Sequence, residues 1–189
     1  MDETIYNKYK KAGKIAAEAR EYGVSLIKPG VRFLEVANLI ESMIIKKGAG
    51  LAFPVNISIN EVAAHFSPRH DDILIFKKGN IVKLDIGAHI DGYIADTAIT
   101  IEIGTNNYSN MIKASKDALE NALALVKANI DLSEIGKVVE DTIKNHGFKP
   151  INNLSGHSMV QYELHSGISV PNVSNTHSKI KPKDGDVLA

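Results

Sequence analysis

Two aspartates, Asp85 and Asp96, flank a tight-turn signal in a predicted β-hairpin, and their spacing suits metal chemistry. The dipeptide Asp91-Gly92 between them favours a type I′ turn, in which both central residues adopt positive φ. This turn pairs Ile90 with Tyr93 and makes the aspartates diagonal neighbours on one face, about 7 Å apart. Two carboxylates at that distance on a largely buried sheet repel each other unless a cation or a shared proton lies between them. A divalent metal site would remove that repulsion. The alternative is a solvated face on which each aspartate meets a lysine.

The opposite face of the same hairpin is apolar. Its members are Val82, Leu84, Ile86, Ala88, Ile90, Tyr93, Ala95, Ile99 and Ile101. A shift of one residue in the pairing would turn this whole set to the other face, so the pattern supports the predicted register.

Apolar spacing predicts two helix pairs, each followed by strands. The predicted helices span residues 7–27, 33–47, 109–127 and 133–146, the last with Ser133 as its N-cap. The predicted strands lie near 53–58 and 63–66 and in the hairpin 81–103. The third helix is expected to turn one stripe inward, made of Ile112, Ser115, Leu119, Ala122, Leu123 and Val126.

The two helix pairs also match each other residue by residue. A shift of 99 positions lays Leu26, Lys28, Glu35, Glu41, Ile44 and Gly48 on Leu125, Lys127, Glu134, Glu140, Ile143 and Gly147. Matched glutamates and a matched terminal glycine go beyond the apolar stripe that any two amphipathic helices share. We therefore predict a single domain of two similar halves, about residues 1–105 and 108–189.

A second internal match concerns the end of the chain. Residues 78–82 resemble residues 184–188 at an offset of 106, so the counterpart of Asp85 would fall at position 191. A domain rarely ends by breaking off a strand that needs a partner, so we expect the chain to be incomplete at its C-terminus.

The composition is that of an ordinary globular protein of 189 residues, with 44% hydrophobic and 23% charged residues. Lys+Arg and Asp+Glu both number 22, so the net charge does not favour a nucleic-acid or membrane-surface role. The lack of cysteine excludes disulfides, thiolate zinc sites and cysteine nucleophiles. No apolar run approaches the roughly 20 residues of a membrane span, and the charged N-terminus does not resemble a signal peptide. A cytoplasmic location is expected.

Three histidines are candidates for metal binding or proton transfer. His157 and His165 each have a glycine within two residues, which lets the backbone turn sharply or approach closely. His65 lies on a short apolar segment before a loop. A purely structural histidine is the alternative for each of them. The remaining histidines are expected at the surface or at helix ends: His70, His89, His146 and His177.

Together these segments resemble the methionine aminopeptidases, and most closely the type 2, archaeal-style form of this pita-bread metallopeptidase family. The matching segments, in the family's order, are AAHFSP (63–68), KLDIG (83–87), IADT (94–97), NLSGH (153–157) and LHSG (164–167). The resemblance runs over essentially the whole chain. It implies an α+β pita-bread fold, in which two pseudo-symmetric halves of helix pairs pack on a curved, mainly antiparallel sheet.

The resemblance also implies a dinuclear metal site made of two aspartates, one histidine and two glutamates. Asp85 and Asp96 match the aspartates, His157 matches the histidine ligand, and His65 and His165 match two catalytic histidines that contact substrate. Both glutamates lie later in the family pattern than the residues present, so the 189-residue piece alone is expected to be inactive.

The implied cofactors are two divalent ions, chosen from Co²⁺, Mn²⁺, Fe²⁺ and Zn²⁺, which suit oxygen-rich ligands and one imidazole. The pocket for the methionine side chain of the substrate is expected to be lined by Phe53, Ile57, Ile59 and Phe66.

The implied activity is hydrolysis of the first peptide bond of nascent polypeptides, which removes the initiator methionine when the second residue is small. The implied partners are nascent N-termini and the ribosome, and neither DNA nor a membrane is an implied partner. The enzyme is expected to be a monomer. A proline-type peptidase of the same fold shares the metal ligands, but the NLSGH context (153–157) argues against it. A non-catalytic pita-bread binding protein typically loses ligands, whereas this chain keeps all those that its length allows.

Overall fold

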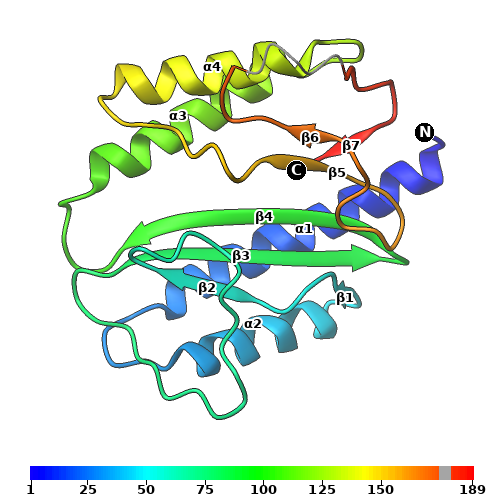
Figure 1. Cartoon of the computed structure of the whole chain (residues 1–189). Helices are drawn as coiled ribbons and strands as arrows, with labels where there is room; N and C mark the ends of the chain where they lie inside the picture. The colour runs from blue at the N-terminus through cyan, green and yellow to red at the C-terminus, as the bar shows by residue number, and fades with distance from the viewer. Residues whose placement is uncertain (175–179) are drawn as a thin grey trace. The chain divides into compact units, whose positions relative to one another are not determined.

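Two helix-and-strand units make up this computed structural model, which describes residues 1–174 and 180–189 (Figure 1). One unit spans residues 2–106, and the other spans residues 107–189 together with Met1. His177, expected at the surface, lies outside the described residues. Among the residues that the structure describes, no helix is long and apolar enough to cross a membrane.

In the unit 2–106, two helices pack against a four-stranded antiparallel sheet (Figure 1). The elements are α1 (Glu3–Leu26), α2 (Phe33–Lys46), β1 (Gly50–Leu51), β2 (Asn56–Ile59), β3 (Ile81–Ile90) and β4 (Tyr93–Glu102). The long strand β3 pairs with β1, β2 and β4. This central strand therefore organises the sheet on which the two aspartates lie.

Helix α1 begins earlier than the apolar pattern predicts because Asp2 caps it. The Asp2 carboxylate accepts a hydrogen bond from the backbone N–H of Ile5 at 2.9 Å. The buried side of α1 carries small residues, and a Cβ on Gly23 would lie 2.6 Å from Ile40 Cδ1 and 2.7 Å from Leu84 Cδ2. The lack of a side chain at Gly23 thus lets α1 approach both α2 and the sheet closely.

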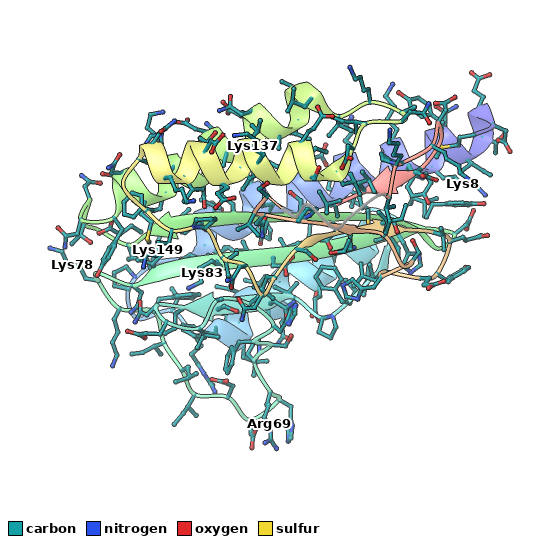
Figure 2. All side chains as sticks on the ribbon, turned by 45° about the horizontal axis from the view of Figure 1, so that its top comes forward. Lys8, Arg69, Lys78, Lys83, Lys137 and Lys149 are labelled. Carbon is teal, nitrogen blue, oxygen red and sulfur yellow. The ribbon has the colours of Figure 1, made fainter. Side chains whose placement is uncertain are left out.

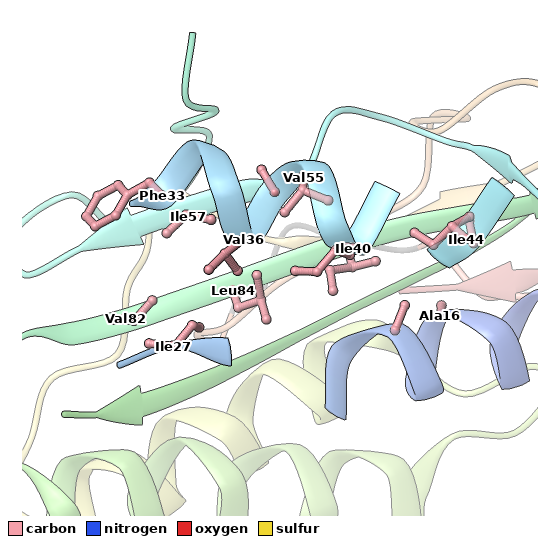
Figure 3. Close-up of a cluster of buried hydrophobic side chains, with 14 of the residues drawn as sticks. Ala16, Ile27, Phe33, Val36, Ile40, Ile44, Val55, Ile57, Val82 and Leu84 are labelled. Carbon is pink, nitrogen blue, oxygen red and sulfur yellow. The ribbon is translucent and has the colours of Figure 1, made fainter. Parts of the chain in front are cut away.

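The hairpin of β3 and β4 has the predicted register. Ile90 pairs with Tyr93, and Asp91 and Gly92 have φ values of 50° and 83°, as a type I′ turn requires. The predicted apolar face is also confirmed, because Val82 and Leu84 are fully buried on it, against the helices. Figure 3 shows these two side chains among those of α1 and α2.

The unit 107–189 contains a helical hairpin and a small antiparallel sheet. Its elements are α3 (Ser109–Leu125), α4 (Leu132–Asn145), β5 (Gly156–Met159), β6 (Ser169–Val170) and β7 (Val187–Leu188). Strand β5 lies between β6 and β7. Helix α3 packs on α4 with a face of small side chains, Ala114, Ala118 and Ala122, all of which are buried.

Two local predictions for this unit are wrong. Asp131 rather than Ser133 is the N-cap of α4, and its Oδ1 accepts a hydrogen bond from the Ser133 backbone N–H at 2.9 Å. The predicted inward stripe of α3 is largely exposed, with Leu119 at 58% and Leu123 at 62% of their full exposure. Of that stripe only Ala122 is buried, and it belongs to the buried alanine face, whose small side chains allow α3 and α4 to approach each other closely.

Candidate metal site and substrate histidines

Asp85 and Asp96 lie on the same face of the hairpin, as predicted. Asp85 is opposite Ala98 and Asp96 is opposite Gly87, so the two aspartates are diagonal cross-strand neighbours. Both side chains are partly buried. This face is opposite the one that packs against α1 and α2, so the carboxylates are kept out of the apolar core.

The electrostatics of this pair fit a divalent cation. Burial, the negative charge of Asp85 and a hydrogen bond to Asp85 together raise the pKa of Asp96 to about 7, and burial is the largest of these causes. Because burial is the largest cause, the alternative of a solvated face does not describe this site. A cation between the two carboxylates would oppose their repulsion, and their hard oxygen donors suit a divalent ion.

Lys83, which is labelled in Figure 2, is two positions from Asp85 on β3 and therefore shares its face of the sheet. Its Nζ donates a hydrogen bond to the backbone oxygen of Asn60 at 2.7 Å. Burial lowers the pKa of the Lys83 ammonium, while the nearby Glu61 carboxylate acts in the opposite direction. This lysine therefore reaches the loop that follows β2.

The sequence did not reveal two polar neighbours of this pair. Asn56 Nδ2 donates a hydrogen bond to Asp85 Oδ2 at 3.4 Å, and Ser67 Oγ donates one to Asn56 Oδ1 at 2.7 Å. Asn56 is the direct cross-strand partner of Asp85 in β2. Ser67 is part of the segment 63–68 that resembles the family, and this is the only sequence signal that could have drawn attention to it.

His65 lies in the loop after β2 and has an unusual backbone conformation. Its φ is 66°, which is uncommon for a residue with a side chain. The loop is fastened to β2, because the Ile57 N–H donates to the Phe66 oxygen at 2.7 Å and the Phe66 N–H donates to Ser58 Oγ at 3.3 Å. The His65 side chain is exposed on this anchored loop and is accessible to a ligand.

His157 and His165 lie side by side in the unit 107–189. His157 is on β5 and its Nδ1 is buried, and the two ring centroids are 4.3 Å apart with an edge-to-face arrangement. The hydroxyl of Ser158 accepts hydrogen bonds from Ser166 Oγ at 2.7 Å and from the Ile168 N–H at 3.0 Å. These bonds anchor the loop that carries His165.

The remaining described histidines have other surroundings. His146 is the C-cap residue of α4, as expected for a helix end, and its Nε2 lies 3.0 Å from Asp117 Oδ2. His89 is partly buried rather than at the surface, and its Nδ1 accepts a hydrogen bond from the Gly92 N–H at 3.0 Å. His70 is exposed, as predicted.

Two of the four residues expected to line a methionine pocket face the other way. Ile57 pairs with Leu84 and Ile59 pairs with Val82, so both point to the core face of the sheet. The prediction is wrong for them because β2 places Asn56, rather than the isoleucines, on the aspartate face. Phe66 also packs against that core.

Phe53 covers the aspartate face beside Asp96. A Cβ built on Gly87 would lie 2.3 Å from Phe53 Cε1, and Gly87 is the cross-strand partner of Asp96. Only glycine at this strand position leaves room for the aromatic ring, so Phe53 is the one residue of the expected pocket wall that borders the carboxylate pair.

The predicted ligands come from both units, Asp85 and Asp96 from residues 2–106 and His157 from residues 107–189. Within the described residues, no group of three or more histidine, cysteine, aspartate or glutamate side chains could hold a metal ion. The structure therefore brings the two aspartates together, and the assignment of His157 as the third ligand stays a prediction.

The chain matches the family model for metallopeptidase family M24 over residues 7–189. The chain belongs to the M24 metallopeptidase family. Membership of this family implies dependence on a metal ion. The resemblance found in the sequence motifs is thereby confirmed at the level of the family.

Curated relatives and solved structures of this family match the chain closely. It is 52% identical to a methionine aminopeptidase of Methanocaldococcus jannaschii over 168 residues, which cover 89% of this chain and 57% of that protein. It is 49% identical to a methionine aminopeptidase of Pyrococcus abyssi over 179 residues, which cover 95% of this chain and 60% of that protein. The chain thus spans about three fifths of these relatives.

The fold agrees with that of a solved family member. The crystal structure of a methionine aminopeptidase from Thermotoga maritima matches with a TM-score of 0.91 at 27% identity, covering 100% of this chain and 78% of that one. The predicted α+β fold of the pita-bread type is therefore confirmed.

Proposed function

We propose that the protein containing this chain removes the N-terminal initiator methionine from nascent polypeptides by metal-dependent hydrolysis of the first peptide bond. The observation that most supports this is the partly buried carboxylate pair Asp85–Asp96. It lies in a chain that is 52% identical to a methionine aminopeptidase. A pair of acidic side chains held together away from bulk water needs a cation to ionise fully at neutral pH.

The proposed metal ligands are Asp85, Asp96 and His157, and the proposed cofactors are two divalent ions from among Co²⁺, Mn²⁺, Fe²⁺ and Zn²⁺. Such ions, when bound, would activate water and polarise the scissile carbonyl as Lewis acids. Asp96 must lose its proton to act as a ligand. Burial first, and then the charge of Asp85, raise the pKa of metal-free Asp96 to about 7, so a divalent ion would compete with a proton for this carboxylate near neutral pH.

His65 and His165 are proposed to act on the substrate. His165 would donate a hydrogen bond to the oxygen on which negative charge develops, a contact that is stronger in the transition state than in the ground state. The hydrogen bonds of Ser158 to the loop of His165 support this role, because they restrict the position of the imidazole. His65 would bind the substrate backbone or hold the transferred proton.

The proposed substrates are nascent N-termini whose second residue is small, and the ribosome that presents them is the proposed macromolecular partner. We propose that the enzyme acts in the cytoplasm. We further propose that the enzyme is a monomer and that residues 1–105 and 108–189 are halves of a single catalytic domain. Phe53, beside Asp96, is the proposed contact for the methionine side chain.

Peptide hydrolysis tests the proposal. The full-length gene product is incubated with Mn²⁺ or Co²⁺ and Met-Ala-Ser, and free methionine is measured beside an Asp96→Asn control. Release of methionine by the native protein but not by the Asp96→Asn variant supports the proposal. Cleavage of X-Pro peptides instead would assign a proline-type peptidase, and hydrolysis of neither substrate would leave a non-catalytic binding protein.

A further inference from the structure

Asn56 borders the carboxylate pair from the β2 side of the sheet. It is the direct cross-strand partner of Asp85, and Ala98 is the partner of Asp85 on the β4 side. The three side chains therefore form one row on the same face of the sheet. Asn56 supplies the polar side chain of that row next to Asp85, and its Nδ2 donates a hydrogen bond to Asp85 Oδ2 at 3.4 Å.

Ser67 determines which end of the Asn56 amide faces Asp85. An ionised carboxylate only accepts hydrogen bonds, so the amide NH₂ must face Asp85 and the amide oxygen must face away from it. The hydroxyl of Ser67 donates to that amide oxygen at 2.7 Å. Ser67, Asn56 and Asp85 thus form a chain in which each residue donates a hydrogen bond to the next.

The position of Ser67 depends on the loop that also carries His65. Backbone bonds between Ile57 and Phe66, and a bond from Phe66 to Ser58, hold this loop on β2. Ser58 is almost completely buried, so this attachment is shielded from water. The hydroxyl of Ser67 therefore lies on a well-anchored backbone and can hold the Asn56 amide in a single orientation.

We propose that Asn56, oriented by Ser67, is a positioning residue that holds the Asp85 carboxylate in the conformation required to bind a divalent ion. This inference rests on the proposed metal site. A carboxylate that is already held loses less side-chain freedom when the ion binds, so the affinity for the ion increases. Hydrogen-bond partners of metal ligands typically contribute about 10- to 100-fold to metal affinity.

Metal binding without turnover tests the role of Asn56. Mn²⁺ affinity is measured by calorimetry on the metal-free full-length gene product, and the Co²⁺ absorption spectrum reports the geometry of the ligands. Asn56→Ala is expected to weaken Mn²⁺ binding about 10-fold and to alter the Co²⁺ spectrum. Ser67→Ala should cause a smaller loss in the same direction. Ser67→Thr keeps the hydroxyl and should restore native affinity.

Matched controls separate this role from a general loss of hydrogen bonds. Asn121→Ala removes a bond to Thr142, and Ser25→Ala removes a bond to the Tyr22 carbonyl, and neither bond involves Asp85, Asn56 or Ser67. These two variants should bind Mn²⁺ with native affinity. Circular dichroism checks that every variant is folded, and if Asn56→Ala is not folded, the Ser67→Ala and Ser67→Thr pair decides the question.

Two results would overturn the inference in distinguishable ways. Native affinity and a native Co²⁺ spectrum in Asn56→Ala, together with loss of binding in Asp85→Asn, would remove the role of Asn56 and leave the proposed function intact. Native Mn²⁺ affinity in Asp85→Asn itself would remove both the positioning role and the proposed metal site.

Discussion

At Asp96, burial and a neighbouring negative charge act in the same direction. Each favours the protonated carboxyl, and the pKa rises from an ordinary value of 3.8 to about 7. A cation bound between Asp96 and Asp85 would reverse the effect of the neighbouring charge. The same two side chains can therefore hold a proton when no metal is bound and a divalent ion when one is available.

This property predicts a pH dependence for the metal-free protein. Folded Asp96 keeps its proton up to a pKa of about 7, whereas in the unfolded chain it ionises near 3.8. The folded state thus binds more protons than the unfolded chain between these two pH values. As the pH rises through this interval, the free energy of unfolding should fall by about 1 kcal/mol per pH unit, and it should level off above pH 7. Urea denaturation of chelator-treated protein across this range measures the slope. An equally steep slope in Asp96→Asn would contradict the assignment.

Metal content distinguishes the proposed ligand from the proposed substrate histidine. Asp96→Asn should lose bound metal and all metal-dependent activity, because a charged ligand is removed. His165→Ala should retain its metal while turnover falls about 100-fold or more, because the transition state loses a hydrogen-bond donor. Elemental analysis beside steady-state kinetics checks both variants. The division of roles is wrong if the two lose metal equally.

At the scale of elements, the β3–β4 hairpin depends on its turn. Gly92 has a φ of 83°, and a Cβ in this left-handed region costs about 1–2 kcal/mol. Gly92→Ala should therefore destabilise the protein by about that amount, as measured by urea denaturation. The turn is also tied to α1, because Lys8 Nζ lies 2.9 Å from Asp91 Oδ2.

Gly13 in α1 provides the matched control for this substitution. A Cβ there would meet its nearest neighbour, the Ala95 Cβ, at 4.0 Å, so an alanine fits. Because glycine lowers helix stability, Gly13→Ala should stabilise the protein by about 0.5–1 kcal/mol. If Gly92→Ala and Gly13→Ala changed the free energy of unfolding in the same direction, the positive φ of Gly92 would not be the reason for the effect of Gly92→Ala.

At the scale of the whole molecule, the two units differ in the size of their apolar cores. Residues 2–106 form one large buried cluster built from both helices and the sheet. The described part of 107–189 forms two small clusters, and Leu119 and Leu123 are exposed on α3. Since the stability of a segment depends on the apolar surface that it buries, the two units should open with different free energies.

Hydrogen exchange measures this difference directly. Backbone amides of β3 and β4 should exchange more slowly than those of α3 and α4, at a pH where the intrinsic exchange rates are matched. Mass spectrometry of peptides from each element reports the protection. Equal protection in the hairpin and in α3 would show that the size of the apolar cluster does not determine local stability here.

The β3–β4 hairpin and its carboxylate pair could be predicted from the sequence because the signals that determine them are local. The Asp91-Gly92 turn and the alternation of apolar residues act over a few neighbouring residues, and together they determine the register and hence the shared face of Asp85 and Asp96. The ordered motifs around His65, His157 and His165 pointed to the family in the same way.

Only the tertiary structure decided which residues surround that pair and which face of α3 is buried. Asn56 lies beside Asp85 because β2 pairs with β3 across an intervening loop, and no turn signal in the chain specifies that register. Ile57 faces the core for the same reason. On α3, the leucines carry the stronger apolar signal, yet the alanines are buried, because the approach of α4 depends on side-chain size as well as on hydrophobicity.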